Sequence, residues 1–311
     1  MRSTGLGAAG AVGAADAVGA ADGGEGTAGL PPCPAPPAGG ACPAGGARPA
    51  AAASFLEQAV VEENGAFASG IFRLVLGAPR TAGCLEPGQF VHLPLPGSES
   101  RLLRRPFSVY RTDASNGFVE VVYQTVGAGT RFLAGVRPGT ALDLVAPLGR
   151  GWQVPPGTRK ALVVAGGVGM APLNMLVARL LEEGGVHLVV GARSADCLVP
   201  LAVPVGVGAG RLGTVTVTDD GSAGCKGLTT DVTRELLQQE AFDYVATCGP
   251  EPMLRIVAEL ALAAGVPCEV SLERRMACGI GACLSCAVPT RTGLRRACAD
   301  GPVFDAREVL W

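Results

Sequence analysis

Four cysteines near the carboxyl end of the chain have the spacing of an iron–sulfur ligand set. They begin in the stretch "ACGIGACLSCAV": four residues separate Cys278 from Cys283, two separate Cys283 from Cys286, and eleven separate Cys286 from Cys298. In the plant-type arrangement, one loop supplies three thiolates to a 2Fe–2S cluster and a distant residue supplies the fourth. Glycines inside the loop allow its backbone to wrap around such a cluster. The spacing therefore predicts a 2Fe–2S site with these four cysteines as metal ligands.

Zinc is the competing metal, because four cysteines can also hold a structural zinc ion. Structural zinc sites usually combine two short pairs of cysteines, whereas Cys298 stands apart from the other three ligands. The spacing therefore favours the 2Fe–2S cluster. The alternative is a zinc-stapled, non-catalytic nucleotide-binding module.

A glycine-rich stretch, "VVAGGVGMAP" at 163–172, has the chemistry of a dinucleotide loop. Gly167 and Gly169 would let backbone N–H groups approach a pyrophosphate, and the helix that follows carries partial positive charge at its first turn. Pro172 stands where such loops usually have glycine, and it suits the first turn of a helix because its missing N–H is not needed there. We expect a nucleotide site here, and a tight turn without a ligand is the alternative.

A second stretch, "TCGPEPML" at 247–254, ends a predicted strand and opens a predicted helix. Ligands of open α/β sheets bind outside the carboxyl ends of the strands. Cys248, Gly249 and Pro250 are therefore expected to line a nicotinamide pocket. On spacing alone, Cys248 could equally be an inert buried thiol.

The stretches "RRPFSVY" at 104–110 and "VYQTVGAGT" at 122–130 combine a cation, aromatic residues and glycines. Arg105 and the backbone near Thr130 could bind a pyrophosphate, and Phe107 and Tyr123 could face a flat ring. By composition alone, the plainer interpretation is a β barrel that carries one basic residue.

The elements that must position these residues fall into four ranges. Residues 53–153 contain short β-type runs bordered by glycine or proline, which predicts an antiparallel β barrel. Residues 154–265 alternate strands with amphipathic helices, which predicts an α/β domain with a parallel sheet. Residues 266–311 are cysteine-rich and irregular, as expected of a small 2Fe–2S subdomain. Residues 1–52 are almost entirely Ala, Gly and Pro, and we expect them to be disordered.

Composition excludes several function classes. The chain has 25 basic and 27 acidic residues, so no basic excess indicates binding to nucleic acid or to an anionic membrane surface. The apolar stretch at 197–210 is too short for a membrane span and is interrupted by two prolines and three glycines. Because no convincing signal peptide is visible, we expect a cytoplasmic protein without disulfides.

The order of barrel, nucleotide sheet and cysteine cluster resembles the ferredoxin–NADP reductase superfamily, in which "RPFS" and "GxGT" bind flavin and "GxGxxP" and "CGP" bind the nicotinamide cofactor. The stretches "LLRRPFSV", "SLERRMACGIGACLSC" and "CADGPVFDAREVLW" together resemble the electron-transfer subunits of NAD-dependent (class 1B) dihydroorotate dehydrogenases. The resemblance covers roughly residues 54–311.

This resemblance implies FAD, NAD and a 2Fe–2S cluster as cofactors, and electron transfer in pyrimidine biosynthesis as the function. It implies a partner, an FMN-containing catalytic subunit that oxidises dihydroorotate to orotate, with two copies of each chain in a heterotetramer. The homologous subunit of an NADH-dependent ferredoxin:NADP reductase or a sulfhydrogenase is the alternative. Arg193 lies where the 2′-phosphate of NADP could be met, but the resemblance favours NAD. The implied FAD site comprises Arg105, Pro106, Phe107, Ser108, Val122, Tyr123, Gln124, Gly129 and Thr130.

Overall fold

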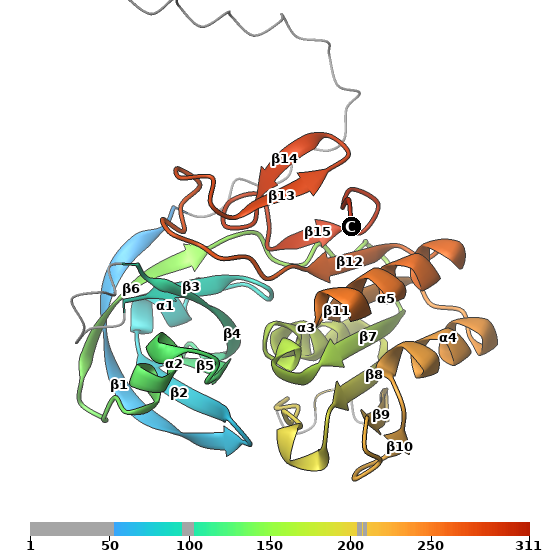
Figure 1. The fold of residues 1–311 in the computed structure, drawn as a ribbon, viewed down its shortest axis with the longest axis horizontal. Coiled ribbons are helices and arrows are strands. Elements are labelled where there is room, and N and C mark those ends of the chain that lie inside the picture. The colour runs from blue at the N-terminus through green and yellow to red at the C-terminus, as the bar shows by residue number, and fades with distance from the viewer. Residues whose placement is uncertain (1–52, 95–102, 204–206, 208–209) are drawn as a thin grey trace, which may run out of the picture. The chain divides into compact units, whose positions relative to one another are not determined.

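The computed structural model describes residues 53–94, 103–203, 207 and 210–311 (Figure 1). The segment 1–52, for which disorder is predicted, lies outside the described residues. None of the helices in the described part of the chain is long and apolar enough to cross a bilayer.

Six strands form a closed barrel in the order β1-β2-β5-β4-β3-β6, and every neighbouring pair is antiparallel. Buried and less buried residues alternate in the first halves of β1 and β6, because successive side chains of a strand point to opposite faces, whereas β3 and the middle of β5 are buried on both faces. The predicted antiparallel barrel is confirmed. Its strands and two short helices are β1 (Phe55–Ala68), β2 (Ile71–Gly77), α1 (Pro79–Ala82), β3 (Phe90–Leu93), β4 (Arg105–Asp113), β5 (Phe118–Gln124), α2 (Ala128–Ala134) and β6 (Ala141–Leu148).

Besides the barrel, the structure contains a seven-stranded sheet in the order β10-β9-β8-β7-β11-β12-β15. All neighbouring pairs are parallel except β12 and β15. The predicted parallel sheet with covering helices is therefore confirmed. Its elements are β7 (Lys160–Gly166), η1 (Gly167–Gly169), α3 (Met170–Glu183), β8 (Gly185–Ala192), η2 (Ala195–Cys197), β9 (Leu212–Thr218), β10 (Cys225–Lys226), α4 (Thr229–Gln239), β11 (Tyr244–Cys248), α5 (Glu251–Ala263), β12 (Cys268–Ser271) and β15 (Val303–Asp305).

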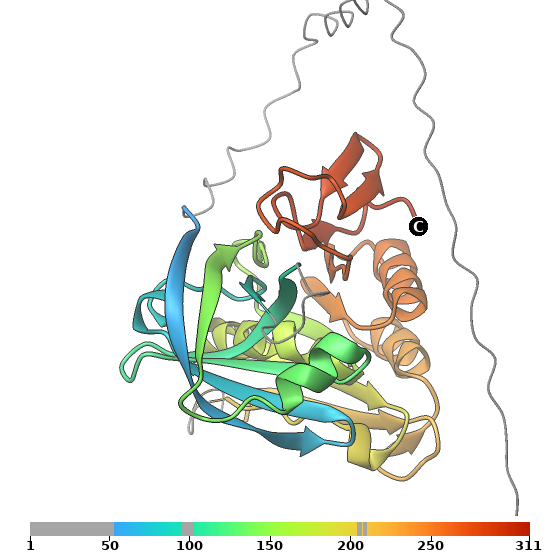
Figure 2. The same ribbon diagram turned by 60° about the vertical axis from the view of Figure 1, so that its left-hand side comes forward.

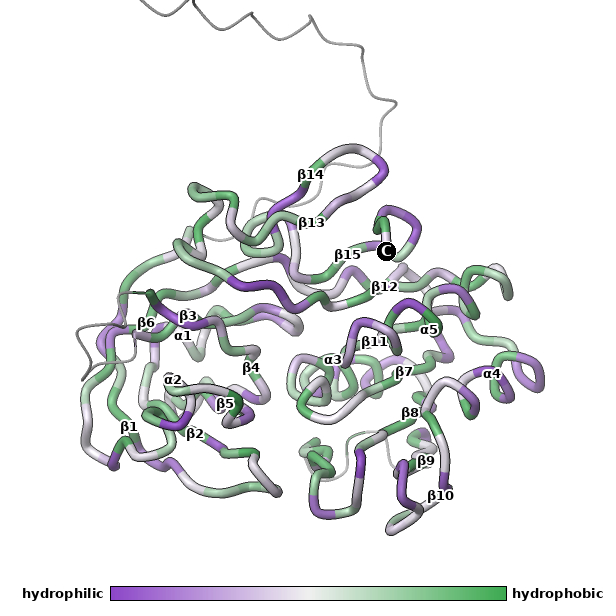
Figure 3. The backbone as a smooth tube through the Cα atoms, in the orientation of Figure 1, coloured by the Kyte–Doolittle hydropathy of each residue, from purple (hydrophilic) through white to green (hydrophobic). Residues whose placement is uncertain are grey.

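The two faces of the sheet are buried under different helices. On β7, Val163 packs in the core that holds the apolar face of α3, while Leu162 and Val164 pack in the core that holds α5. Figure 3 shows hydrophobic residues along β7 and β8, and many hydrophilic residues along α4. Because both faces of the sheet are buried, the sequences of β7 and β8 are almost continuous runs of apolar residues.

The segment after α5 is more regular than the sequence indicates. β12 extends the parallel sheet, β15 closes its edge, and β13 (Ala287–Thr290) pairs with β14 (Gly293–Arg296) in a separate hairpin. Strands of three or four residues are too short to show a recognisable period in a cysteine-rich stretch. In Figures 1 and 2 this segment, drawn in red, lies beside both the barrel and the sheet.

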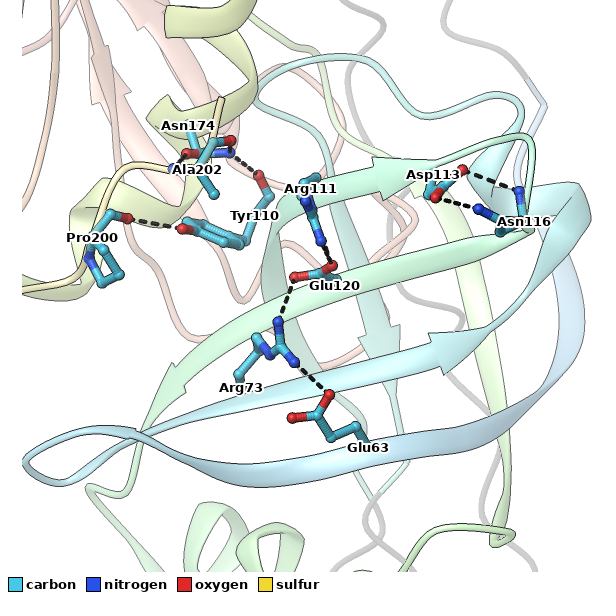
Figure 4. A network of polar contacts seen from close by, with 10 residues as sticks. All are labelled: Glu63, Arg73, Tyr110, Arg111, Asp113, Asn116, Glu120, Asn174, Pro200 and Ala202. Carbon is cyan, nitrogen blue, oxygen red and sulfur yellow. Dashed lines mark hydrogen bonds and ion pairs between the residues drawn. The ribbon is translucent and has the colours of Figure 1, made fainter. Parts of the chain in front are cut away.

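Buried polar contacts fasten the barrel to the α/β sheet (Figure 4). Asn174 of α3 donates to the backbone oxygens of Tyr110 and Ala202, at 3.0 Å each, and accepts from the N–H of Ala202 at 2.8 Å. The hydroxyl of Tyr110 donates to the oxygen of Pro200 at 2.8 Å. Buried, fully paired networks of this kind fix one orientation of the elements they join. The strand that carries the predicted flavin motif is thereby held against the helix that follows the glycine loop.

Candidate cofactor-binding and electron-transfer site

A cavity of about 800 Å³ lies beside β4 and β5 of the barrel. This volume is within the usual range of ligand pockets. All the predicted flavin residues line the cavity except Gly129: Arg105, Pro106, Phe107, Ser108, Val122, Tyr123, Gln124 and Thr130. The structure thus brings together two stretches that are distant in sequence, because β4 and β5 are neighbours in the barrel.

The two aromatic residues of this cavity belong mainly to the barrel core. The residues Phe107 and Tyr123 are only 7% and 3% exposed, and their ring centroids lie 5.6 Å apart in an edge-to-face arrangement. The Tyr123 hydroxyl donates to Asn64 at 3.0 Å. Their packing makes this wall of the cavity rigid, while little of either ring is left to face a ligand.

Arg105 is the cation of this cavity. Its guanidinium donates to the backbone oxygens of Leu103 at 2.8 Å and Arg104 at 3.3 Å, and no carboxylate of the described residues forms an ion pair with it. Part of its donor set is therefore available to an anionic ligand. Thr130 shapes the facing loop, because its hydroxyl accepts hydrogen bonds from the N–H groups of Val126 and Gly127 at 3.0 and 3.2 Å.

A second cavity, of about 690 Å³, lies at the carboxyl ends of the parallel strands. Two pairs of residues for which the sequence predicts a nicotinamide cofactor line this cavity: Gly167 and Gly169 after β7, and Gly249 and Pro250 after β11. Gly169 sits so close to the second loop that a Cβ there would lie 2.3 Å from the oxygen of Cys248. Only glycine permits this approach of the two loops. After the ligands that the sequence predicts for them, we call the cavity beside β4 and β5 the flavin cavity and the cavity at the ends of the parallel strands the nicotinamide cavity. Cys248 lines the flavin cavity and is absent from the lining of the nicotinamide cavity.

The two cavities share a wall. Gln124 from the barrel, Val168 from the glycine loop, and Leu272, Glu273 and Arg274 from the segment after β12 line both of them. Ligands in the two cavities would therefore approach each other at this wall. The sequence interpretation missed the residues after β12, because they precede the cysteines and were assigned to the cluster subdomain.

Two titratable side chains that line the flavin cavity, Cys248 and Glu273, have raised pKa values. Burial raises the pKa of the Cys248 thiol to about 12, with a further contribution from the negative charge of Glu273. Cys248 is thus a neutral thiol at physiological pH and does not act as a nucleophile. Glu273 borders the open cavities, yet the surrounding protein desolvates its carboxyl and raises its pKa.

The cysteine loop directs backbone N–H groups at sulfur atoms. The N–H groups of Ile280 and Ala282 donate to Cys278 Sγ at 3.4 and 3.3 Å, and the N–H of Gly281 donates to Cys298 Sγ at 3.1 Å. Hydrogen bonds of this kind stabilise negative charge on sulfur and tune iron–sulfur clusters. The loop therefore has the donor arrangement that thiolate ligands of a cluster require.

The four cysteines lie close enough to influence one another: Cys278 acts on Cys283, and both Cys286 and Cys278 act on Cys298. Hydrogen bonds from Ser285 first, and from Cys278, lower the pKa of Cys283 to about 6. Burial first, and then the contact with Cys286, raise the pKa of Cys298 to about 12. Two thiolates on each of two irons is the ligand distribution of a 2Fe–2S cluster, whereas a structural zinc ion would draw all four sulfurs to one point. These contacts do not by themselves distinguish the two metals, and the 2Fe–2S interpretation rests on the spacing of the four cysteines.

The cluster loop begins at the wall of the flavin cavity. Arg275 and Met276 line that cavity, and Cys278 follows two residues later. In space, the order is therefore nicotinamide cavity, flavin cavity and cysteine loop. Along the chain the order differs, because the flavin stretches at 105–130 precede the glycine loop at 163–172.

Comparison with known proteins supports a flavin domain and an iron–sulfur domain in this chain. A family model described as the iron–sulfur cluster binding domain of dihydroorotate dehydrogenase B matches residues 273–310, and an oxidoreductase FAD-binding domain model matches residues 61–152. A chain in a solved structure of the NADH-dependent reduced ferredoxin–NADP oxidoreductase is 31% identical, with a TM-score of 0.72, over 81% of this chain and 90% of that chain.

The matches to curated relatives extend over most of this chain and over nearly the whole length of each relative. The protein named dihydroorotate dehydrogenase B (NAD(+)), electron transfer subunit, of Bacillus velezensis is 40% identical over 256 residues, which are 80% of this chain and 96% of the relative. The protein of the same name in Desulforamulus reducens is 36% identical over 249 residues, or 78% and 94%. This chain therefore belongs to the family of electron transfer subunits of dihydroorotate dehydrogenase B.

Proposed function

We propose that this chain carries electrons between a partner FMN subunit, which oxidises dihydroorotate to orotate, and NAD+, in pyrimidine biosynthesis. The observation that carries the proposal is the spatial order of its sites. The nicotinamide and flavin cavities share a wall, and the cysteine loop follows Arg275 and Met276, which line the flavin cavity alone. The curated relatives at 35–40% identity carry the corresponding name.

A flavin between the other two cofactors supplies the required chemistry, because it exchanges hydride with nicotinamide and single electrons with an iron–sulfur cluster. The chain's own residues would bind and orient these groups. Gly167 and Gly169 would admit the pyrophosphate of NAD, and Arg105 would bind that of FAD. The N–H groups of the cysteine loop would stabilise the charge of the cluster thiolates.

We further infer how the cysteine loop meets the partner. Cys283 is exposed, and the apolar side chains of Ile280 and Leu284 on either side of it are 61% and 63% exposed. Large apolar side chains in solvent often mark a protein–protein interface. We propose that this face docks the FMN subunit, with two copies of each chain in the complex.

The positions of the two cavities and of the cysteine loop along the chain suggest three functional ranges. We propose residues 53–153 as the FAD-binding part, 154–265 as the NAD-binding part and 266–311 as the cluster subdomain, with β12 and β15 contributed by the last range to the sheet of the second. We also propose a cytoplasmic location, because a reducing compartment keeps the thiols available as cluster ligands.

The homologous subunit of a ferredoxin:NADP reductase or a sulfhydrogenase is not favoured. The curated relatives named as dihydroorotate dehydrogenase B subunits reach 40% identity, against 31% for the chain of the ferredoxin–NADP oxidoreductase. The zinc-stapled module is not favoured either, since the family model over residues 273–310 is an iron–sulfur domain.

Co-purification with the FMN subunit tests the proposal. The two chains are co-expressed, and the complex is analysed for mass, FAD, FMN, iron and sulfide. We expect Leu284→Asp to lose the FMN subunit while retaining FAD, and the matched Leu262→Asp, on the outer face of α5, to retain both. A Leu284→Asp chain that still binds the FMN subunit with wild-type affinity would contradict the docking face.

A further inference from the structure

His92 is a histidine whose ring is buried without a hydrogen-bond partner among the described residues. It lies on β3 of the barrel, its exposure is 0%, and neither ring nitrogen has a hydrogen-bond partner within the described part of the chain. A buried polar group without a partner is costly and rare, so each case calls for a physical explanation.

The ring of His92 packs against the cysteine loop. A Cβ added to Gly279 would lie 2.5 Å from His92 Nδ1 and 3.0 Å from Cε1, so the loop backbone lies directly against the imidazole. Gly279 has a φ of +73°, and it follows Cys278 directly. The contact therefore places the Nδ1 side of the ring beside the residue that directly follows the first predicted cluster ligand.

His92 also belongs to the strand that supports the flavin cavity. In the antiparallel pairing of β3 with β4, His92 lies opposite Pro106, which lines that cavity. Its backbone oxygen accepts from Arg104 at 3.4 Å. A single residue thus connects the barrel wall of the flavin cavity with the loop that holds the cysteines.

We propose that a ring N–H of His92 donates a hydrogen bond to a sulfur atom of the iron–sulfur cluster held by the cysteine loop. Burial lowers the pKa of His92 to about 4, and the neutral ring retains one N–H. The protonated ring carries two, so the hydrogen bond does not depend on the titration of His92. A donor at this position stabilises the added negative charge of the reduced cluster and so raises its reduction potential.

The inference rests on the proposed function, because it requires a cluster in the loop. Its test uses a property of the sequence: the chain contains only two histidines, His92 and His187. His187 lies on β8, packs edge-to-face on Phe242 and lies 3.5 Å from a carboxylate oxygen of Glu240. Labelling histidine alone with ¹⁵N therefore gives two candidate signals and a matched control residue.

The full-length holoprotein is labelled with ¹⁵N-histidine, reduced, and examined by pulsed EPR. We expect a ¹⁵N coupling to the reduced cluster that His187→Gln retains and His92→Gln loses. In a redox titration, His92→Leu is expected to lower the equilibrium constant for cluster reduction about tenfold, which corresponds to about 59 mV for one electron.

The possible results distinguish failure of the proposed hydrogen bond from failure of the proposed function. A wild-type protein with an EPR-visible cluster but no ¹⁵N coupling would overturn the hydrogen bond, as would an unchanged potential in His92→Leu. A protein with zinc and no iron would instead refute the proposed function. If a His92 variant fails to fold or to retain the cluster, the labelled wild-type protein still gives the decisive result.

Discussion

The substitution Gly169→Ala tests whether the close contact of two loops creates the nicotinamide site. The added Cβ would lie 2.3 Å from the oxygen and 2.6 Å from the carbonyl carbon of Cys248, whereas ordinary contacts begin near 3.4 Å. Both clashing atoms are backbone, so the loops after β7 and β11 must separate by about 1 Å. Overpacking of this kind costs about 1–3 kcal/mol of unfolding free energy, and a misplacement of about 1 Å at a reacting centre can cost about 100-fold in rate.

Stopped-flow measurement of flavin reduction by NADH is the assay for this variant, with chemical denaturation for stability. We expect the rate of flavin reduction to fall by about 100-fold while FAD content stays unchanged, since Arg105 and its strand are untouched. Gly213→Ala on β9 is the matched control, because a Cβ there meets nothing within 4 Å. Its unfolding free energy should change by less than about 0.5 kcal/mol, and its flavin should be reduced at the wild-type rate. Wild-type reduction kinetics in Gly169→Ala would refute the loop contact as the basis of the site.

Three further predictions concern the neighbouring residues. Arg105→Ala should yield a folded protein depleted in FAD, measured by flavin absorbance per chain; full occupancy would show that the FAD phosphates bind elsewhere. Asn174→Ala should lower the unfolding free energy by about 1–3 kcal/mol, because it leaves buried backbone groups near Tyr110 without partners; an unchanged denaturation midpoint would contradict this. NADH should reduce the flavin much faster than NADPH, because Asp219 lines the same cavity as Arg193 and would repel a 2′-phosphate; a preference for NADPH would refute the NAD assignment.

The fold could be predicted largely because its signals are local. Leu173, Leu176, Val177 and Leu180 recur at helical spacing and form the buried face of α3, and the apolar run of 161–165 forms the buried part of strand β7. The strands of the barrel were likewise recognisable from their turn residues. β12 and β15 were not, since each is shorter than one full pattern and is stabilised by pairing with distant strands.

Site residues could be predicted from the sequence only where they lie together in one short motif. The flavin stretches and the cysteine spacing each contain their chemistry within a short segment. The wall shared by the two cavities depends on Leu272 and Glu273 meeting Gln124 and Val168, which are about 100 or more residues away in the sequence. His92 shows the same limit, because the sequence contains no signal that a barrel strand will contact Gly279.

The most direct test of the relay is the coupled oxidation of dihydroorotate by NAD+, measured with and without the FMN subunit in wild type and in Cys283→Ala. The wild-type chain alone should oxidise no dihydroorotate, and addition of the FMN subunit should create the activity. Cys283→Ala should lose iron and the coupled activity, yet its FAD should still be reduced by NADH, because the FAD and nicotinamide cavities lie apart from the exposed Cys283. Dihydroorotate oxidation by this chain alone, or coupled activity that survives in iron-free Cys283→Ala, would contradict the account.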